Sequence, residues 1–570
     1  FNLGKHDSGV EKTLKQFDKA NIVKRIWDMD PSVWKEGEEY NTLITNRLGW
    51  LTLPVSMKSK CDEINSCADV LRSEGYTHAV VLGMGGSSMC PEVCRDTFGV
   101  KAGYLNLLVL DSTDPATIME IENSIDVEKT VFIVSSKSGS TIEVDSFFRY
   151  FFDKVQKLKG AEAGQNFIAI TDPGTQLESL AKEKHFRKIF SNPSEIGGRY
   201  SALSYFGLVP AALIGVDIYK LLGNAEKMMS DCMTTEIKKN PGVYLGSAIA
   251  ELAIKSIDKL TFFLPFHINS FGFWVEQLIA ESTGKENKGV IPIEGEGIGK
   301  TSSYGKDRLF IFMSLGKEKK DEKKIIKGFR KKSFPVIEID LKNIYDVGGQ
   351  FYLWEFATAV MGAAMEINPF DEPNVKESKD NTGSVLSYFE INKKLPKQKA
   401  RAQEKELSID FDEKSFQKKS FTKGKSVKGG FDDILEFFLK LTKKDDYISL
   451  MAYIQKDRVN ENLLQKIREL LRSKKEVATT LGYGPRFLHS TGQLHKGGPG
   501  NGLYIQIVSD DKDDLEIPGK PFTFGILKQA QAIGDYQSLI KHKRKVIRVN
   551  LGVNIEKGLK DLYKQIKKAL

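Results

Sequence analysis

Short, continuously apolar runs alternate with helical patterns along most of the chain, and this alternation constrains its fold more than any other feature. A strand that is apolar throughout needs helices on both faces of its sheet, as in parallel α/β domains. The sequence therefore predicts a parallel α/β domain between about residues 60 and 219. We expect its strands at 79–82, 105–110, 130–134, 167–171 and 188–190.

The alternation returns in two further parts of the chain. We expect strands at 260–264, 308–314 and 335–339 with an apolar helix at 351–365, and later strands at 447–454, 503–508 and 545–549. Because domains usually have about 100–200 residues, a chain of 570 residues accommodates three. We divide it into a leader (1–44), a first domain (45–222), a second domain (223–395), a linker (396–430) and a C-terminal α/β domain (431–570).

Positive charge is concentrated in one segment. The chain carries 84 Lys and Arg against 75 Asp and Glu, and residues 391–430 hold 12 of the basic and 5 of the acidic residues. A nucleic-acid-binding protein spreads its excess over a folded groove. We therefore expect no nucleic-acid partner and interpret 396–430 as a basic, solvated linker.

Two further classes are disfavoured by cysteine usage and hydropathy. The five cysteines are odd in number and form no CxxC pair, which fits neither a secreted disulfide framework nor a zinc site. The most apolar short stretch, 206–216, is much shorter than the roughly 20 residues of a membrane helix. We therefore expect a cytoplasmic protein without a membrane partner.

Two loops that follow predicted strands have the composition of ligand-binding turns. The sequence GMGGSS at 83–88 would let a ligand approach the backbone, but it is neither GxGxxG nor followed by GK[ST], and a plain tight turn is an equal alternative. The sequence SSKSGST at 135–141 offers hydroxyls, a lysine and a glycine before a helix, which suits a phosphate monoester. A helix N-cap needs only one hydroxyl, so we favour a phosphate site there.

Two ionisable residues are candidates for catalysis. Arg199 follows two glycines, where its guanidinium would be free to stabilise negative charge, although a surface ion pair is the alternative. Glu281 falls on the last turn of an apolar helix, where the helix dipole disfavours an anion. That position indicates proton transfer, with an exposed helix-end glutamate as an equal alternative.

Together these stretches resemble the phosphoglucose isomerases. SSKSGST, IGGRYSALS and EQLIAESTGKENKG are similar to the phosphosugar loop, the arginine signature and the glutamate signature of that family, and they occur in family order. INPFDEPNVKESK resembles the carboxy-terminal signature NxFDQxGVExxK, whose final lysine falls on Lys379. The resemblance covers about 45–395 and implies tandem flavodoxin-like sugar isomerase (SIS) domains with parallel sheets, followed here by a third, smaller α/β unit.

The histidine of the family's LHSxGQ motif does not follow the glutamate signature closely in this chain. The motif occurs only in the third unit, as LHSTGQ, which contains His489. The surrounding GYGPRFLHSTGQLHKGGP resembles the isomerase half of transaldolase–phosphoglucose isomerase fusions. We take His489 as the histidine, with His495 as the alternative. Lys528 is a weaker rival to Lys379, and we interpret it as a solvent-facing helix lysine.

The resemblance implies reversible interconversion of glucose 6-phosphate and fructose 6-phosphate through a cis-enediol intermediate, in glycolysis and gluconeogenesis. His489 with Lys379 would open the sugar ring, Glu281 would move the proton between C2 and C1, and Arg199 would offset the negative charge. The remaining expected contacts are with the sugar, from Gly86 and Ser87, and with the phosphate, from Ser136, Lys137, Ser138 and Thr141. No step needs a metal or a redox cofactor.

The resemblance also bears on partners. It implies a small-molecule sugar phosphate and a homodimer that shares groups across its interface, although a third domain could instead deliver His489 within one chain. Because the sequence begins at Phe1, we also expect that a transaldolase domain could precede it in a longer native chain. The alternatives are an isomerase of another phosphosugar, such as mannose 6-phosphate, and a non-catalytic sugar-phosphate-binding module. Such a module would not need Glu281, Arg199 or the lysine-terminated signature.

Overall fold

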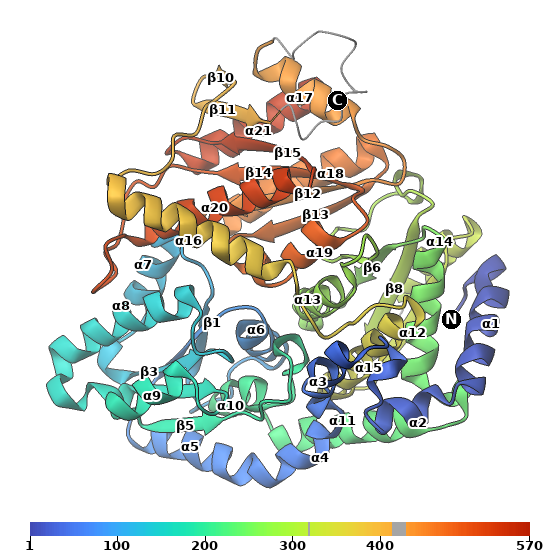
Figure 1. The fold of residues 1–570 in the computed structure, drawn as a ribbon, viewed down its shortest axis with the longest axis horizontal. Coiled ribbons are helices and arrows are strands. Elements are labelled where there is room, and N and C mark those ends of the chain that lie inside the picture. The colour runs from blue at the N-terminus through green and yellow to red at the C-terminus, as the bar shows by residue number, and fades with distance from the viewer. Residues whose placement is uncertain (317–319, 413–428) are drawn as a thin grey trace.

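The first sheet has the five predicted strands. The computed structural model, which describes residues 1–316, 320–412 and 429–570 (Figure 1), places them at β1 (His78–Gly83), β2 (Asn106–Leu110), β3 (Thr130–Ser135), β4 (Phe167–Thr171) and β5 (Lys188–Ser191). They are parallel in the order β2-β1-β3-β4-β5. β1 lies inside the sheet, with β2 on one side of it and β3, β4 and β5 in order on the other. The strand order therefore switches sides between β1 and β3, which is the flavodoxin-like arrangement.

Alternate residues of β1 explain why helices cover both faces of this sheet. Ala79 and Val81 belong to one apolar core and Val80 and Leu82 to another, because side chains alternate along a strand. The first core contains side chains of α5 (Cys61–Ser73), α6 (Gly86–Phe98) and α10 (Tyr205–Leu213). The second contains side chains of α7 (Pro115–Ser124), α8 (Ile142–Lys159) and α9 (Gln176–Glu183).

The second sheet is also parallel, in the order β7-β6-β8-β9, and its strands are β6 (Lys259–Phe263), β7 (Ile291–Ile293), β8 (Arg308–Leu315) and β9 (Val336–Leu341). The sequence did not predict β7, which has only three residues and contains Pro292; proline is tolerated because β7 lies at the sheet edge. The principal helices of this unit are α11 (Ile218–Met233), α12 (Pro241–Ile254), α13 (Phe271–Thr283), α14 (Lys320–Lys331) and α15 (Val347–Ala364).

The N-terminal leader folds against the second unit. Its helices are α1 (Asp7–Lys19), α2 (Ile22–Trp27) and α3 (Glu38–Thr45). Trp34 is buried and its indole N–H donates to the carbonyl of Ala359 on α15 at 2.7 Å. A buried indole N–H usually has such a partner, so this contact fixes the leader on α15.

The third sheet is mixed, in the order β10-β11-β15-β14-β12-β13. Its parallel strands are β12 (Tyr447–Tyr453), β13 (Ala478–Tyr483), β14 (Gly502–Val508) and β15 (Lys545–Asn550). The sequence did not predict β13, because two threonines and a glycine interrupt its apolar pattern at the sheet edge. The helices of this unit are α17 (Phe431–Lys440), α18 (Arg458–Lys475), α19 (Gly492–Gly497), α20 (Phe524–Lys541) and α21 (Ile555–Ala569).

Part of the expected linker is folded. β10 (Ala402–Glu404) and β11 (Leu407–Phe411) are antiparallel to each other, and β11 pairs with β15. Leu407, Ile409 and Phe411 alternate along β11 and are buried, a period-two pattern that the surrounding charge obscured in the sequence. The prediction of a solvated linker is therefore wrong for these strands, and residues 413–428 lie outside the described ranges.

The three units meet along α16 (Val375–Asn392), the yellow helix between the orange-red third unit and the blue-cyan first unit in Figure 1. Val385 and Leu386 of α16 belong to the same apolar core as Leu527 of α20. Asn381 of α16 donates to the Ser538 hydroxyl of α20 at 2.8 Å. In the described part of the chain, no helix is long and apolar enough to cross a membrane.

The crossing of α12 and α15 depends on a glycine. A Cβ at Gly246 would lie 2.4 Å from the carbonyl oxygen of Ala357 and 2.7 Å from Cβ of Val360, whereas a Cβ at Gly223 on α11 would meet nothing within 4 Å. Gly246→Ala should therefore lower the free energy of unfolding by about 1–3 kcal/mol. Gly223→Ala should raise it by up to about 1 kcal/mol. Thermal unfolding followed by circular dichroism compares them, and a Gly246→Ala protein as stable as the wild type would refute this packing.

Candidate active site

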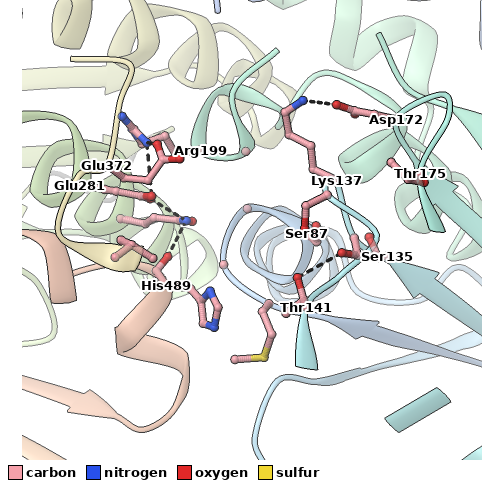
Figure 2. A pocket seen from close by; sticks show the side chains of 18 of the residues that line it. Ser87, Ser135, Lys137, Thr141, Asp172, Thr175, Arg199, Glu281, Glu372 and His489 are labelled. Atoms are coloured by element: carbon pink, nitrogen blue, oxygen red, sulfur yellow. Dashed lines mark hydrogen bonds and ion pairs between the residues drawn. The ribbon is translucent and has the colours of Figure 1, made fainter. Parts of the chain in front are cut away.

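A cavity of about 620 Å³ lies where the three units meet, and side chains from all three line it (Figure 2). Figure 2 shows Arg199, Glu281, Glu372 and His489 on one side of the cavity and Lys137 and the hydroxyl-rich loop on the other. Ten residues selected from the sequence line this cavity, namely Gly86, Ser87, Ser136, Lys137, Ser138, Thr141, Arg199, Glu281, Lys379 and His489. Their individual roles stay predictions.

The hydroxyl-rich loop joins β3 to α8. Thr141 is the residue before α8, but its side chain makes no capping hydrogen bond. Its hydroxyl lies 3.1 Å from that of Ser136, which accepts the backbone N–H of Gly139 at 3.2 Å. The capping explanation therefore does not account for Thr141, and the hydroxyls of Ser136 and Thr141 lie together at the cavity wall.

Lys137 contacts its own protein as well as the cavity. Its ammonium group pairs with the carboxylate of Asp172 and donates to the carbonyl of Ser194 at 3.0 Å. Burial raises the pKa of Asp172 although Lys137 acts in the opposite direction. An incoming anion therefore competes with Asp172 for this lysine.

The glycines of the first loop are required by packing. A Cβ at Gly86 would lie 1.9 Å from the carbonyl oxygen of Gly198, and Gly85 has a φ of +56°. A Cβ at Gly85 would lie 2.9 Å from the carbonyl oxygen of His489. The start of α6 therefore packs directly against the loops that carry Arg199 and His489, which brings both residues to the cavity.

Arg199 is not free, contrary to the expectation from its two preceding glycines. Its side chain is buried, and its Nε donates to the Ser282 hydroxyl at 2.8 Å while Nη2 donates to the carbonyls of Pro369 and Asp371, both at 2.8 Å. Nη1 lies 3.0 Å from Glu372 Oε2. A buried guanidinium requires such acceptors because an unpaired buried charge is very costly, so the acceptors leave Arg199 no freedom to move.

Glu281 is a buried carboxylate with few partners. Its Oε1 lies 3.3 Å from Arg199 Nη1, and its Oε2 accepts from Gln277 Nε2 at 3.2 Å. Burial raises its pKa, Arg199 opposes this, and the nearby charge of Glu372 adds to it. A carboxylate with a raised pKa suits proton transfer near neutral pH.

His489 ends a short 3-10 turn (Arg486–His489) and is held by a carboxylate that the sequence analysis missed. Its Nε2 lies 2.9 Å from Oε1 of Glu143, and Gln531 Nε2 donates to the same oxygen at 2.7 Å. Burial acts to raise the pKa of Glu143, but His489, a backbone hydrogen bond and the charge of Lys379 together lower that pKa. Glu143 lies two residues after Thr141, so a motif extended into α8 would have included it.

Gln277 is a second residue that the sequence analysis missed. Its Nε2 donates both to Glu281 and to the carbonyl of His489, the latter at 2.8 Å. It lies four residues before Glu281 on α13, and residues four apart share one face of a helix. Gln277 thus links the helix of the second unit to the loop of the third.

The two alternative residues lie outside the cavity. His495 is buried beside the rings of Phe487 and Tyr504, and burial lowers its pKa far below the usual value. Lys528 is fully buried and pairs with Asp114 at 2.8 Å and with Asp511, so its interpretation as a solvent-facing lysine is wrong. The sequence around Lys528 predicts a helix correctly. It does not show that Lys528 is buried, because the two carboxylates that pair with it come from loops elsewhere in the chain.

Comparison with known proteins supports the resemblance to phosphoglucose isomerases. A family model described as phosphoglucose isomerase matches residues 52–295. The chain is 27% identical to a probable glucose-6-phosphate isomerase of Methanococcus maripaludis, over 68% of this chain and 95% of that protein. It is 28% identical to a glucose-6-phosphate isomerase of Carboxydothermus hydrogenoformans, over 60% of this chain and 85% of that protein. Over the matched part, the chain resembles the phosphoglucose isomerases.

Solved structures agree with the fold of a phosphoglucose isomerase. A hypothetical protein from Thermus thermophilus has a TM-score of 0.56 at 22% identity and covers 67% of this chain and 98% of its own. A glucose-6-phosphate isomerase from Chlamydia trachomatis has a TM-score of 0.51 at 17% identity, with 66% and 79% covered. The predicted α/β fold with tandem sugar isomerase domains is confirmed. The family model includes Arg199 and Glu281 but ends before Lys379 and His489.

The pairing of Lys137 with Asp172 predicts how this protein binds anions. Asp172→Asn should tighten binding of inorganic phosphate several-fold because the competing carboxylate charge is gone. Lys137→Met should weaken it about tenfold, as expected for the loss of one charge-assisted hydrogen bond. Calorimetric titration measures both, and the control is Asp153→Asn, which removes a carboxylate paired with a lysine on α8 outside the cavity. Weaker phosphate binding by Asp172→Asn would contradict this competition.

Proposed function

We propose that this chain interconverts glucose 6-phosphate and fructose 6-phosphate, with the cavity between its three units as the active site. The observation that carries the proposal is the position of the buried Glu281 across one cavity from the hydroxyl-rich loop. The matched family and the names of its relatives support the same reaction.

The phosphate end of the substrate binds at the loop between β3 and α8. The hydroxyls of Ser136, Ser138 and Thr141 and the ammonium group of Lys137 face the cavity there and supply several donors for one phosphate. Binding the remote phosphate fixes the reacting carbons against the opposite wall, where Glu281 lies. The backbone at Gly86 and Ser87 contacts the sugar between these two ends.

Ring opening requires a proton to pass between the ring oxygen and a hydroxyl. His489 exchanges this proton, and Glu143, 2.9 Å from its Nε2, holds the imidazole in place. Lys379 on α16 also lines the cavity and assists in the same step. The buried Gln531 fixes Glu143 in turn, so the imidazole has a defined orientation.

Isomerisation then moves a proton between C2 and C1. Glu281 takes the proton from one carbon as a carboxylate and returns it to the other as a carboxylic acid, and the intermediate is a cis-enediol. Arg199 touches Glu281 directly, so its positive charge stabilises both the carboxylate and the negative charge that develops beside it. The C1 oxygen gains a proton as the enediol forms, and the C2 hydroxyl loses one as the ketose forms, so one proton also passes between these neighbouring oxygens.

Gln277 and Glu143 hydrogen-bond to His489 within the same chain, so we infer that His489 acts in its own chain. Chains carrying Glu281→Gln and chains carrying His489→Ala should each be inactive, and a co-expressed, co-purified mixture should stay inactive. If neighbouring chains shared their active sites, a mixed assembly would contain one intact site and regain activity. Regained activity in the coupled assay would therefore refute this inference.

The cellular setting is part of the proposal. All five cysteines are free thiols, which supports a reducing, cytoplasmic location. A homodimer and a preceding transaldolase domain stay predictions from the resemblance.

The first experiment is a coupled assay that follows glucose 6-phosphate formation from fructose 6-phosphate with a chelator present. Activity is expected for the wild type, and Glu281→Gln should lower kcat roughly 10²- to 10⁴-fold while sugar-phosphate binding persists, because the proton acceptor is gone. Normal turnover by Glu281→Gln would refute the assignment. An inactive wild type that binds the sugar phosphate would favour another phosphosugar or a non-catalytic module.

A further inference from the structure

A second carboxylate competes with Glu281 for the same arginine nitrogen. Glu372 lies between α15 and α16 and lines the cavity. Arg199 Nη1 is 3.0 Å from Glu372 Oε2 and 3.3 Å from Glu281 Oε1. The side chain of Glu372 is 40% exposed, whereas those of Arg199 and Glu281 are 2% and 11% exposed. The buried Arg199 thus pairs with two carboxylates, and Glu372, the more exposed of the two, lies nearer to it.

Arg199 cannot turn to favour Glu281. Its Nε is occupied by Ser282 and its Nη2 by the carbonyls of Pro369 and Asp371. A two-nitrogen contact with Glu281, the strongest geometry for an arginine–carboxylate pair, would break these bonds. The guanidinium therefore contacts both Glu281 and Glu372 through Nη1 alone.

The segment that carries Glu372 is itself anchored. Lys285 is buried and its Nζ donates to the carbonyl and to Oδ1 of Asp371, each at 2.6 Å. Burial lowers the pKa of Lys285 to about 8, with Arg199 acting in the same direction. This anchor and the carbonyl contacts of Arg199 hold Glu372 beside the base.

The charged groups around the two carboxylates come from several elements. Those that act on Glu281 are Arg199, Glu372 and His489, with a hydrogen bond from Gln277. Those that act on Glu372 are Arg199, Arg47 and Lys285, which outweigh burial and lower its pKa. Glu372 therefore keeps its charge to lower pH than an ordinary glutamate, while burial and the charge of Glu372 raise the pKa of Glu281.

We propose that Glu372 is a positioning residue that sets the basicity of Glu281 by taking the nearer contact with Arg199. The proposal rests on the proposed isomerase function. In the reaction, the proton leaves C2 for the Glu281 carboxylate and returns from it to C1, so a more basic carboxylate removes the proton faster. Glu372 itself neither gains nor loses a proton.

Replacing Glu372 by glutamine tests this directly. Glu281 is active as a base only above its pKa, so activity is lost as the pH falls through that value. Glu372→Gln removes the like charge and leaves Arg199 to Glu281, so the acidic limb of kcat/KM should move to lower pH by about one unit. The plateau kcat should fall several-fold because the base is weaker. Glu372→Asp keeps the charge and should keep the limb close to its wild-type position.

A matched control separates this effect from a general loss of charge. Glu366→Gln makes the same change at an exposed position six residues earlier that does not line the cavity, and its pH profile should equal that of the wild type. An acidic limb that does not move in Glu372→Gln, or that moves to higher pH, would overturn the proposal. A purely structural role would lower activity without moving the limb.

A measurement without turnover distinguishes failure of this proposal from failure of the proposed function. The glutamate carboxyl groups can be labelled with ¹³C and titrated by NMR, and the resonance of Glu281 assigned by its loss in Glu281→Gln. The titration midpoint of Glu281 should be lower in Glu372→Gln than in the wild type, whichever sugar phosphate the enzyme uses. An unchanged midpoint would overturn the proposal even if the wild type is an active isomerase.

Discussion

The buried guanidinium of Arg199 is the interaction on which the arrangement of the site depends. Burying an unpaired charge costs several kcal/mol, so the arginine requires acceptors on every side. They come from Ser282 and Glu281 on α13 and from the segment that precedes α16. These contacts fix the loop that carries Arg199, helix α13 and the segment before α16 relative to one another. Glu281 is held between them.

The third unit completes a site that the first two units build only in part. It contributes His489. Glu143 from α8 contacts the imidazole of His489, and Gln277 from α13 donates to its backbone carbonyl. The close approach of its loop to Gly85 leaves no room for a side chain at that position. The geometry of this cavity is therefore set by contacts between the three units of the chain.

The first sheet and the hydroxyl-rich loop could be predicted from the sequence, because each is formed by residues that are adjacent in the chain. The strands of the first sheet are continuous apolar runs, and the residues of the 135–141 loop are adjacent in the chain, so pattern and composition identify both. Glu143 and Glu372 were missed because their roles arise from contacts between distant segments. Lys528 was misread for the same reason: its partners, Asp114 and Asp511, are close only in the folded protein.

The central claim is that a carboxylate transfers a proton between C2 and C1 through an enediol. Isomerisation of fructose 6-phosphate in D₂O, followed by NMR of the glucose 6-phosphate formed, tests it most directly. We expect deuterium at C2 in a substantial fraction of the product, because the proton held by Glu281 exchanges with solvent during the lifetime of the intermediate. Product that forms with no deuterium at C2, together with normal turnover by Glu281→Gln, would contradict the claim, since these two results together indicate hydride transfer that needs no carboxylate.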